Sequence, residues 1–280
     1  MLQANLFAPR PPWVAGALEL LARHRFLTAR QLAAALGRAE PEVAPVAEAL
    51  VGEGVLQTLA PTTLSLAKPG SRAFALTRAG LACIAAEGNP SPSRMVRPLT
   101  SSFTLAHELL VNELALVVRL LDARGALRLL LWETRRERIA DVTHLAERGR
   151  AVRVPLVADA LLVVEHQGQR QGLLIEIDMA TVSAKSMRRK FAGYHAWWSE
   201  GGPARRFGLT ASRVLTVAPA VKRLERLRAL SIEAVDARGS GLFWFLPHEA
   251  VDVVAPERLL AAVARVGKAG DESPRPLFPP

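Results

Sequence analysis

The chain of 280 residues has a single cysteine, Cys83, which excludes an intrachain disulfide framework and a zinc site built from several cysteines. It has no run of about 18 uncharged apolar residues, so a membrane-spanning helix is not expected. The first ten residues lack the basic start and the long apolar stretch of a secretory signal peptide. We therefore expect a cytoplasmic protein in a reducing compartment, with no membrane partner.

Two patterns of metal and phosphate chemistry are also missing. The six histidines are scattered without an H-x-x-E-H or similar spacing, so we predict no zinc. The glycine-rich segment 201–203 lacks the Lys-Ser/Thr of a phosphate-binding loop, so nucleotide hydrolysis has no support. What is present is ordinary globular composition: 50% of the residues are hydrophobic and 22% are charged, which argues against a disordered chain.

Positive charge is abundant and unevenly placed. The net charge is +10, and residues 185–228 alone hold eleven basic residues against Glu200 and Glu225. This density favours a polyanionic partner such as DNA, although a solvated helix face is the alternative interpretation. The candidate DNA-binding residues of this segment are Lys185, Arg188, Arg189, Arg205 and Arg206.

Residues 13–88 predict three helices, a hairpin and a closing helix. Thr28 and Gln31 form a capping-box pattern that starts the second helix. Two short strands, 55–59 and 72–76, flank a tip rich in proline and glycine. This order of elements resembles a winged helix.

The hairpin and the third helix of this module differ in charge. Lys68 and Arg72 lie at the wing and are candidates for contacts with a phosphate backbone. The third helix lies in residues 38–53, which carry one arginine against four glutamates. Acidic side chains are repelled by phosphates, so we do not expect this helix to read bases. A protein-contact or dimerisation role for the module is the alternative.

A linker rich in proline and serine is expected at 89–98, before a second domain at 99–266. Its predicted order is helix, three strands, helix and strand, with an exposed excursion up to Arg150. The expected elements are a helix at 102–123, strands at 127–132, 157–164 and 173–178, a helix at 182–199, a strand at 214–217, a helix at 221–230, a strand at 242–246 and a terminal helix near 257–266. We expect the tail, 267–280, to be extended or disordered.

This αβββαβ order is that of the PD-(D/E)xK nuclease superfamily, so we predict an α+β chain with a restriction-endonuclease-like second domain. Asp159 opens the second strand, and Glu176 and Asp178 stand two apart on the third, so both project from one sheet face. Converging carboxylates are the ligands of a hard divalent cation, here Mg²⁺ or Mn²⁺ if the protein is catalytic. Glu113, on the first helix, is a further candidate ligand, with Glu108 and His107 as alternatives.

One position departs from the nuclease motif. Asp178 stands where the motif has its lysine, and Lys185 or Lys190 on the next helix could take that role. We select Lys190 as the candidate catalytic residue, together with Asp159, Glu176 and Asp178. The same helix carries Met187, Phe191, Tyr194 and Trp198 on one face, which indicates packing against the sheet. A scaffold that binds DNA without cutting it is the alternative.

The chain also resembles the replication-relaxation family, which is associated with plasmid replication and relaxation of supercoiled plasmid DNA. The resemblance includes the winged helix, the helix around His107, the block around Asp159, and the segment Glu176-Ile-Asp-Met-Ala-Thr followed by Lys190 and Tyr194. Met179-Ala180 stands where a basic residue and glycine are expected. The resemblance implies a DNA-binding protein of plasmid or mobile-element replication, with nickase activity as a hypothesis. A non-catalytic transcriptional or assembly factor, using the second domain for binding or homodimerisation, is the rival.

Overall fold

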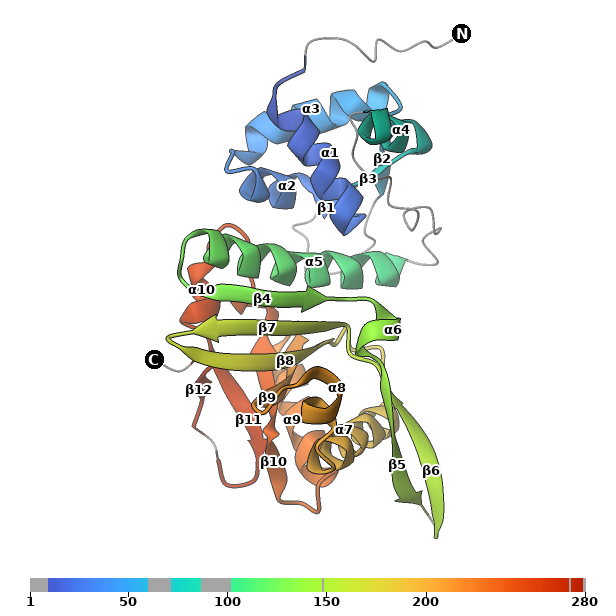
Figure 1. The fold of residues 1–280 in the computed structure, drawn as a ribbon, viewed down its shortest axis with the longest axis vertical. Coiled ribbons are helices and arrows are strands. Elements are labelled where there is room, and N and C mark those ends of the chain that lie inside the picture. Colours follow the sequence, from blue (N-terminus) through green and yellow to red (C-terminus); the bar gives the residue numbers. More distant parts are fainter. Residues whose placement is uncertain (1–9, 60–71, 87–101, 148, 272, 279–280) are drawn as a thin grey trace. The chain divides into compact units, whose positions relative to one another are not determined.

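The computed structural model describes residues 10–59, 72–86, 102–147, 149–271 and 273–278 (Figure 1). Its contacts divide the chain into two compact units, Met1–Leu116 and Val117–Pro280. The division falls within helix α5 (Ser102–Ala123), downstream of the linker that the sequence predicts. The expected α+β class is confirmed: both units combine helices with sheets.

The first unit contains a small antiparallel sheet in the order β1-β3-β2 and the helices around it. Its elements are α1 (Trp13–His24), β1 (Leu27–Thr28), α2 (Ala29–Ala35), α3 (Glu40–Gly52), β2 (Leu56–Leu59), β3 (Ala73–Leu76), α4 (Arg78–Ala86) and the first part of α5. The three predicted helices, the hairpin strands and the closing helix are present. The predicted tip of the hairpin, with Lys68, and the predicted linker lie outside the described residues.

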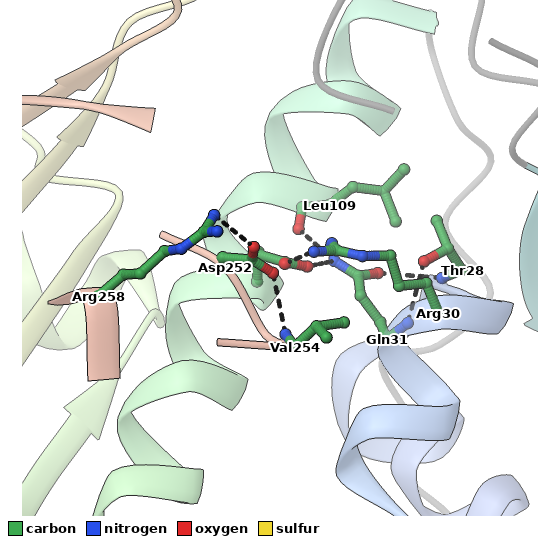
Figure 2. Close-up of polar contacts among 8 residues, drawn as sticks. Thr28, Arg30, Gln31, Leu109, Asp252, Val254 and Arg258 are labelled. Atoms are coloured by element: carbon green, nitrogen blue, oxygen red, sulfur yellow. Dashed lines mark hydrogen bonds and ion pairs between the residues drawn. The ribbon is translucent and has the colours of Figure 1, made fainter. Parts of the chain in front are cut away.

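The capping box at the start of α2 is confirmed. Thr28 Oγ1 accepts a hydrogen bond from the backbone N–H of Gln31 at 3.2 Å, and Gln31 Oε1 accepts one from the backbone N–H of Thr28 at 3.0 Å. The amide of Gln31 also donates to the carbonyl of Leu109 in α5 at 2.9 Å, as Figure 2 shows. Two backbone donors that a helix start leaves open are thereby satisfied, and α2 is joined to α5.

The second unit is built on a seven-stranded sheet in the order β12-β11-β10-β9-β8-β7-β4. Its strands are β4 (Arg128–Glu133), β7 (Ala160–His166), β8 (Gln169–Ile177), β9 (Ser212–Ala218), β10 (Gly239–Pro247), β11 (Val263–Lys268) and β12 (Arg275–Pro276). β8, β9 and β10 are parallel to one another, and the other neighbouring pairs are antiparallel. The remaining elements are α6 (Arg136–Ile139), α7 (Ala184–Ser199), α8 (Gly202–Phe207), α9 (Val221–Glu233), a 3₁₀ turn at His248–Ala250 and α10 (Glu257–Leu260).

Helices α7 and α9 pack side by side against one face of this sheet. Phe191 of α7 meets the rings of Phe243 and Phe245 of β10 edge to face, and Leu227 of α9 is fully buried in the same core. Leu174 of β8 belongs to this core, so the side chains at alternate positions beyond it, Glu176 and Asp178, face the two helices. The core therefore fixes the direction of the acidic residues.

Two features of the second unit differ from the expectation, and the tail is extended as expected. The predicted exposed excursion up to Arg150 contains the strand β5 (Asp141–Glu147). This strand pairs with β6 (Arg150–Leu156) in a β-hairpin that packs on α7. The prediction of a terminal helix near 257–266 is wrong, because α10 ends at Leu260 and the strand β11 follows, with alternate residues buried. The described tail is extended but packed: β12 pairs with β11, and Leu277 and Phe278 are buried.

Within the described parts of the chain, no helix combines the length and the apolar composition needed to cross a membrane.

Candidate functional site

The carboxylates predicted from the sequence lie where β8 ends. The register of β7 and β8 pairs Ala160 with Ile175, which places Asp159 opposite Glu176 one step further along. Asp159 is tied to the β8 backbone: its N–H donates to the carbonyl of Ile175 at 2.9 Å, and its Oδ2 accepts from the N–H of Ile177 at 2.8 Å. Asp159 and Glu176 are thus adjacent across the two strands, as the sequence interpretation requires.

Glu176 is buried and is bonded to two side chains of α7. Tyr194 donates its hydroxyl proton to Oε1 at 2.5 Å, and the ammonium of Lys190 donates to Oε2. Burial raises the pKa of Glu176 to about 7, the charge of Lys190 opposes this rise, and the charge of Asp159 adds to it. Lys190 and Tyr194 stand one helical turn apart, so a single face of α7 supplies both partners.

Tyr194 is the only tyrosine of the chain, and its ring is fully buried. Burial raises the pKa of its hydroxyl well above the usual value of 10, and the neighbouring carboxylate of Glu176 raises it further. The hydroxyl therefore stays protonated and serves as a hydrogen-bond donor. The sequence indicated packing for this residue, and its bond to Glu176 was missed.

The packing face of α7 differs at one position from the prediction. Met187, Phe191 and Tyr194 are buried as expected, but Trp198 is 42% exposed and Trp197 is buried in its place. The indole N–H of Trp197 donates to Asp141 of β5 at 2.8 Å. The hairpin, which the sequence did not reveal, supplies this second packing surface for α7.

Asp178 points to α9 rather than to Glu176. Its carboxylate accepts two hydrogen bonds from the guanidinium of Arg223, at 2.7 Å from Nε and 2.9 Å from Nη2. These bonds raise the pKa of Arg223, although burial opposes the rise. The carboxylate also accepts from the N–H of Ala180 at 3.1 Å. Ala180 has φ +59°, a conformation that favours glycine, which is the residue expected there from the family resemblance.

The cluster therefore brings together Asp159, Glu176 and Lys190, while Asp178 is bonded to Arg223. Glu113, the further ligand candidate, belongs to the first unit, where Arg30 donates to its carboxylate at 2.9 Å and Gln31 at 2.7 Å. Among the residues that the structure describes, no three His, Cys, Asp or Glu side chains are arranged to hold a metal ion. A cation at this position would have Asp159 and Glu176 as its protein ligands, with water and phosphate completing the shell, which is common for Mg²⁺.

Glu133 is a buried carboxylate that no sequence motif indicates. It closes β4 and pairs with Leu161 in register, so it lies at the same end of the sheet as Asp159. The guanidinium of Arg135 binds it at 2.9 Å and 2.5 Å, and these hydrogen bonds lower the pKa of Glu133 to about 2. The surrounding charged residues resembled an exposed segment, so no sequence signal marked this position.

The basic segment 185–228 divides into interior and surface residues. Lys190 and Arg223 bind the carboxylates above, and Arg228 is buried, donating to the carbonyls of Val266 and Asp271 at 2.8 Å. Arg213 lies over the ring of Trp244 at 4.0 Å. Much of the charge that suggested a phosphate-binding surface is therefore used inside the fold.

The predicted DNA-binding residues that the structure describes are exposed, but several have partners. Arg188 pairs with Glu233 at 2.8 Å, Arg189 with Glu147 at 3.0 Å, and Arg72 of the first unit with Glu48 at 3.3 Å. Arg205 and Arg206 donate to the backbone carbonyls of Glu200 and Glu137. Lys185 is exposed and has no partner among the described residues.

Comparison with known proteins gives one solved structure and one family. An XisH family protein from Nostoc punctiforme has a TM-score of 0.26 and 13% sequence identity to this chain; the match covers 51% of this chain and 94% of that one. A comparison with curated proteins finds no match. The family model described as replication-relaxation matches residues 18–212, a range that includes the capping box of α2 and the whole Asp159, Glu176 and Lys190 cluster. On this match, the chain belongs to the replication-relaxation family.

Proposed function

We propose that this protein binds DNA and nicks it during the replication or relaxation of a plasmid or mobile element. Membership of the replication-relaxation family suggests a role in those processes. The observation that carries the catalytic part of the proposal is the contact of Lys190 and Tyr194 with Glu176, beside Asp159. A lysine from the helix after β8 here meets the carboxylate of β8, as proposed from the sequence for the missing motif lysine.

The order of elements in the second unit supports a nuclease-like core. The C-terminal part of α5 is followed by β4, β7, β8, α7 and β9, with the short helix α6 and the β5–β6 hairpin inserted between β4 and β7, and the short helix α8 between α7 and β9. Without these insertions the order is αβββαβ. The carboxylates gather at one end of the central strands, where β8 leaves the sheet toward α7.

Each residue of the cluster has a distinct proposed role. Asp159 and Glu176 would hold Mg²⁺ or Mn²⁺, and this cation, when bound, activates water and neutralises charge on the scissile phosphate. The side chain of Lys190 is 30% exposed, so its ammonium can reach a phosphate oxygen while remaining close to Glu176. Tyr194 fixes the orientation of the Glu176 carboxylate.

Asp178 and Arg223 act as positioning residues in this scheme. Their ion pair joins the end of β8 to the first turn of α9, and both side chains are largely shielded from water. The pair thereby fixes the direction of the chain just beyond Glu176. The three-carboxylate metal site expected from the sequence is thus reduced to Asp159 and Glu176.

The first unit is proposed to be a winged helix. Its element order, α1-β1-α2-α3-β2-β3, and its sheet order, β1-β3-β2, support this assignment. Arg72, directly before β3, is exposed and is proposed to contact phosphates. The acidic first turn of α3, with Glu40 and Glu42, disfavours base reading by that helix.

A second candidate function is non-catalytic DNA binding or assembly by a degenerate nuclease-like domain. It is favoured by the internal cations, because Lys190 and Arg223 already neutralise Glu176 and Asp178. In that case the carboxylates hold helices α7 and α9 to the sheet and have no reacting partner. The two functions differ in what Mg²⁺ does to the protein and to DNA.

Nicking of supercoiled plasmid in Mg²⁺ or Mn²⁺ tests the proposal. We expect the parent to convert supercoiled DNA to open circles, and Glu176→Gln and Lys190→Ala to lose this activity while DNA affinity changes little. Arg170→Ala is the matched control, because Arg170 is exposed at the opposite end of β8. Absence of nicking by a parent that binds DNA would favour the non-catalytic function.

A thermal-shift titration with Mg²⁺ gives a readout that does not depend on turnover. Binding to the native state adds stability by mass action, so the parent should melt at a higher temperature in Mg²⁺. Asp159→Asn should reduce that shift. An equal shift in both proteins would place the cation elsewhere and contradict the site.

A further inference from the structure

The β5–β6 hairpin is a two-stranded ribbon that extends past α7 (Figure 1). Each strand has seven residues, and the pairing is regular from Asp141 opposite Leu156 to Glu147 opposite Arg150. At about 3.4 Å per residue the ribbon is roughly 20 Å long. It is a separate two-stranded sheet, so its backbone makes no ladder with the seven-stranded sheet.

One side of the ribbon is packed on α7. At Gly193, an added Cβ would lie 2.9 Å from Val154 and 3.1 Å from Leu156, so the hairpin approaches the helix backbone closely there. The acidic residues of the hairpin also lie on this side: Asp141 accepts from Trp197, and Glu147 pairs with Arg189. All of these contacts are made with α7.

The other side of the ribbon is exposed except at the half-buried Val142, and it carries no acidic residue. Because side chains alternate along a strand, the outward positions are Val142, His144 and Ala146 on β5, and Ala151, Arg153 and Pro155 on β6. His144 and Arg153 are directly opposite each other, and both are exposed. Neither has a partner within the described part of the chain. The outward side therefore carries one formal positive charge, that of Arg153, and its pair Ala146 and Ala151 has small side chains.

The ribbon is also fixed relative to the candidate site. Gly193, which contacts the hairpin, is adjacent to Tyr194, which binds Glu176, and Lys190 is one turn earlier on α7. A partner bound along the ribbon is thereby held at a set distance from the carboxylates. A second contact on the ribbon would fix the direction of the duplex axis relative to Glu176, where we propose that the backbone is cut.

We propose that the outward side of the β5–β6 ribbon binds in the major groove of duplex DNA, with Arg153 and His144 as its contacts. A two-stranded ribbon fits the width of that groove, and arginine is the residue that most often reads guanine there. The positive charge of Arg153 complements the phosphates that line the groove, while the acidic residues of the hairpin are bonded to α7. This inference rests on the proposed DNA-binding function and names the surface that contacts the duplex.

The test compares the full-length parent with the double variant His144→Ala/Arg153→Ala, using a linear duplex of mixed sequence and fluorescence anisotropy at several salt concentrations. We expect about tenfold weaker binding by the variant and a salt dependence that is flatter by about one unit. Arg170→Ala is the matched control and should bind as the parent does. The melting temperature should not change, because both replaced side chains are exposed.

Methylation of guanine N7 by dimethyl sulfate locates the groove, because N7 lies in the major groove. The parent should protect guanines in the duplex, and the double variant should lose part of that protection. Equal binding by the double variant and Arg170→Ala would overturn the ribbon inference and leave the proposed function intact. If the parent itself binds no duplex, both fail.

Two other outcomes would also overturn the inference. A double variant that binds duplex normally but changes its mass in light scattering would identify the ribbon as an interface between copies of the chain. A variant that loses affinity for single strands alone would identify a single-strand surface.

Discussion

The two units each bury a glutamate to nearly the same extent, and the two residues are held in different ways. Glu113 of the first unit is 7% exposed and Glu176 of the second is 6% exposed. Glu113 accepts from Arg30 and from Gln31, which belongs to the capping box of α2. Glu176 accepts from Lys190 and Tyr194 and lies opposite a second carboxylate, Asp159.

This comparison shows that burial alone does not distinguish a structural carboxylate from a functional one. The bonds of Glu113 continue a network that already serves a helix start, so its removal should affect stability. Burial raises the pKa of Glu176, and the like charge of its neighbour Asp159 raises it further, so the ionised carboxylate costs stability in the absence of a bound divalent cation. Such a cost is typical of functional sites. The following predictions test this contrast.

The largest effect is expected when Arg223 is removed. Arg223→Ala leaves Asp178 charged, with its side chain only 2% exposed, and breaking a buried pair in this way costs about 3–5 kcal/mol. Urea unfolding of the parent and the variant measures the loss. Adding Asp178→Asn to Arg223→Ala should restore much of the stability, because the unpaired charge is then gone. A loss below about 1 kcal/mol would mean that water reaches Asp178 and that the pair does not position β8.

The second effect compares the two buried glutamates directly. Glu113→Ala leaves the amide of Gln31 and the guanidinium of Arg30 without this acceptor, and we expect a loss of about 2–3 kcal/mol. Glu176→Gln keeps an acceptor for Tyr194 and removes a charge that burial disfavours. Lys190 loses its ion pair, but its side chain is 30% exposed and can be hydrated, so the free energy of unfolding should change by no more than about 1 kcal/mol.

Denaturant unfolding and plasmid nicking separate the two roles. Glu113→Ala should lower the free energy of unfolding while the nicking rate per folded molecule is unchanged. Glu176→Gln should leave the free energy of unfolding nearly unchanged and abolish nicking. Equal losses of stability in both variants, with no difference in nicking, would remove the contrast between the units.

Local patterns were the part of the fold that the sequence could predict. The spacing of Thr28 and Gln31 predicts a capping box because both bonds form within four residues. The two-residue spacing of Glu176 and Asp178 predicts a shared sheet face because strand side chains alternate. Asp159 could be placed beside them because β7 and β8 are joined by a tight turn, which sets their register.

The features that the sequence missed depend on contacts between distant residues. Arg223 is 45 residues from Asp178, and nothing near either residue indicates the pair. The hairpin was read as an exposed segment because its charged residues are mixed with apolar ones that pack only on α7. The predicted terminal helix does not continue to residue 266, because from Val263 the chain forms β11, which is stabilised by pairing with β10 and β12 rather than by its own sequence.

The third prediction concerns Glu133, the third buried glutamate among the residues that the structure describes. Its pKa in the folded protein is about 2, below the ordinary 4.5, so the unfolded chain takes up the proton first as the pH falls. The stabilisation is therefore complete above pH 4.5 and is lost as the pH approaches 2. We expect Glu133→Gln to cost about 1 kcal/mol at pH 6, because its partner Arg135 is exposed to solvent and the interaction is partly screened.

Urea unfolding at pH 6 and pH 3 checks the sign of this effect. The difference between the parent and Glu133→Gln should be smaller at pH 3 than at pH 6. A difference that grows toward acid would mean that the folded protein binds the proton more tightly than the unfolded chain.

The smallest effect on stability is expected at the surface pairs of α7. Arg188 and Arg189 pair with Glu233 and Glu147, but all four side chains are more than 40% exposed, so each Arg→Ala change should cost less than about 0.5 kcal/mol.

The basic residues of α7 should differ in how much they contribute to DNA binding, according to whether each already has an acidic partner. Lys185 has no such partner, so Lys185→Ala should flatten the salt dependence by about 0.9 per lost phosphate contact. Arg188→Ala and Arg189→Ala should each flatten it less, because a phosphate must first displace a carboxylate. Anisotropy titrations over a range of salt measure the three slopes, and a steeper loss at Arg188 than at Lys185 would show that DNA breaks these ion pairs readily.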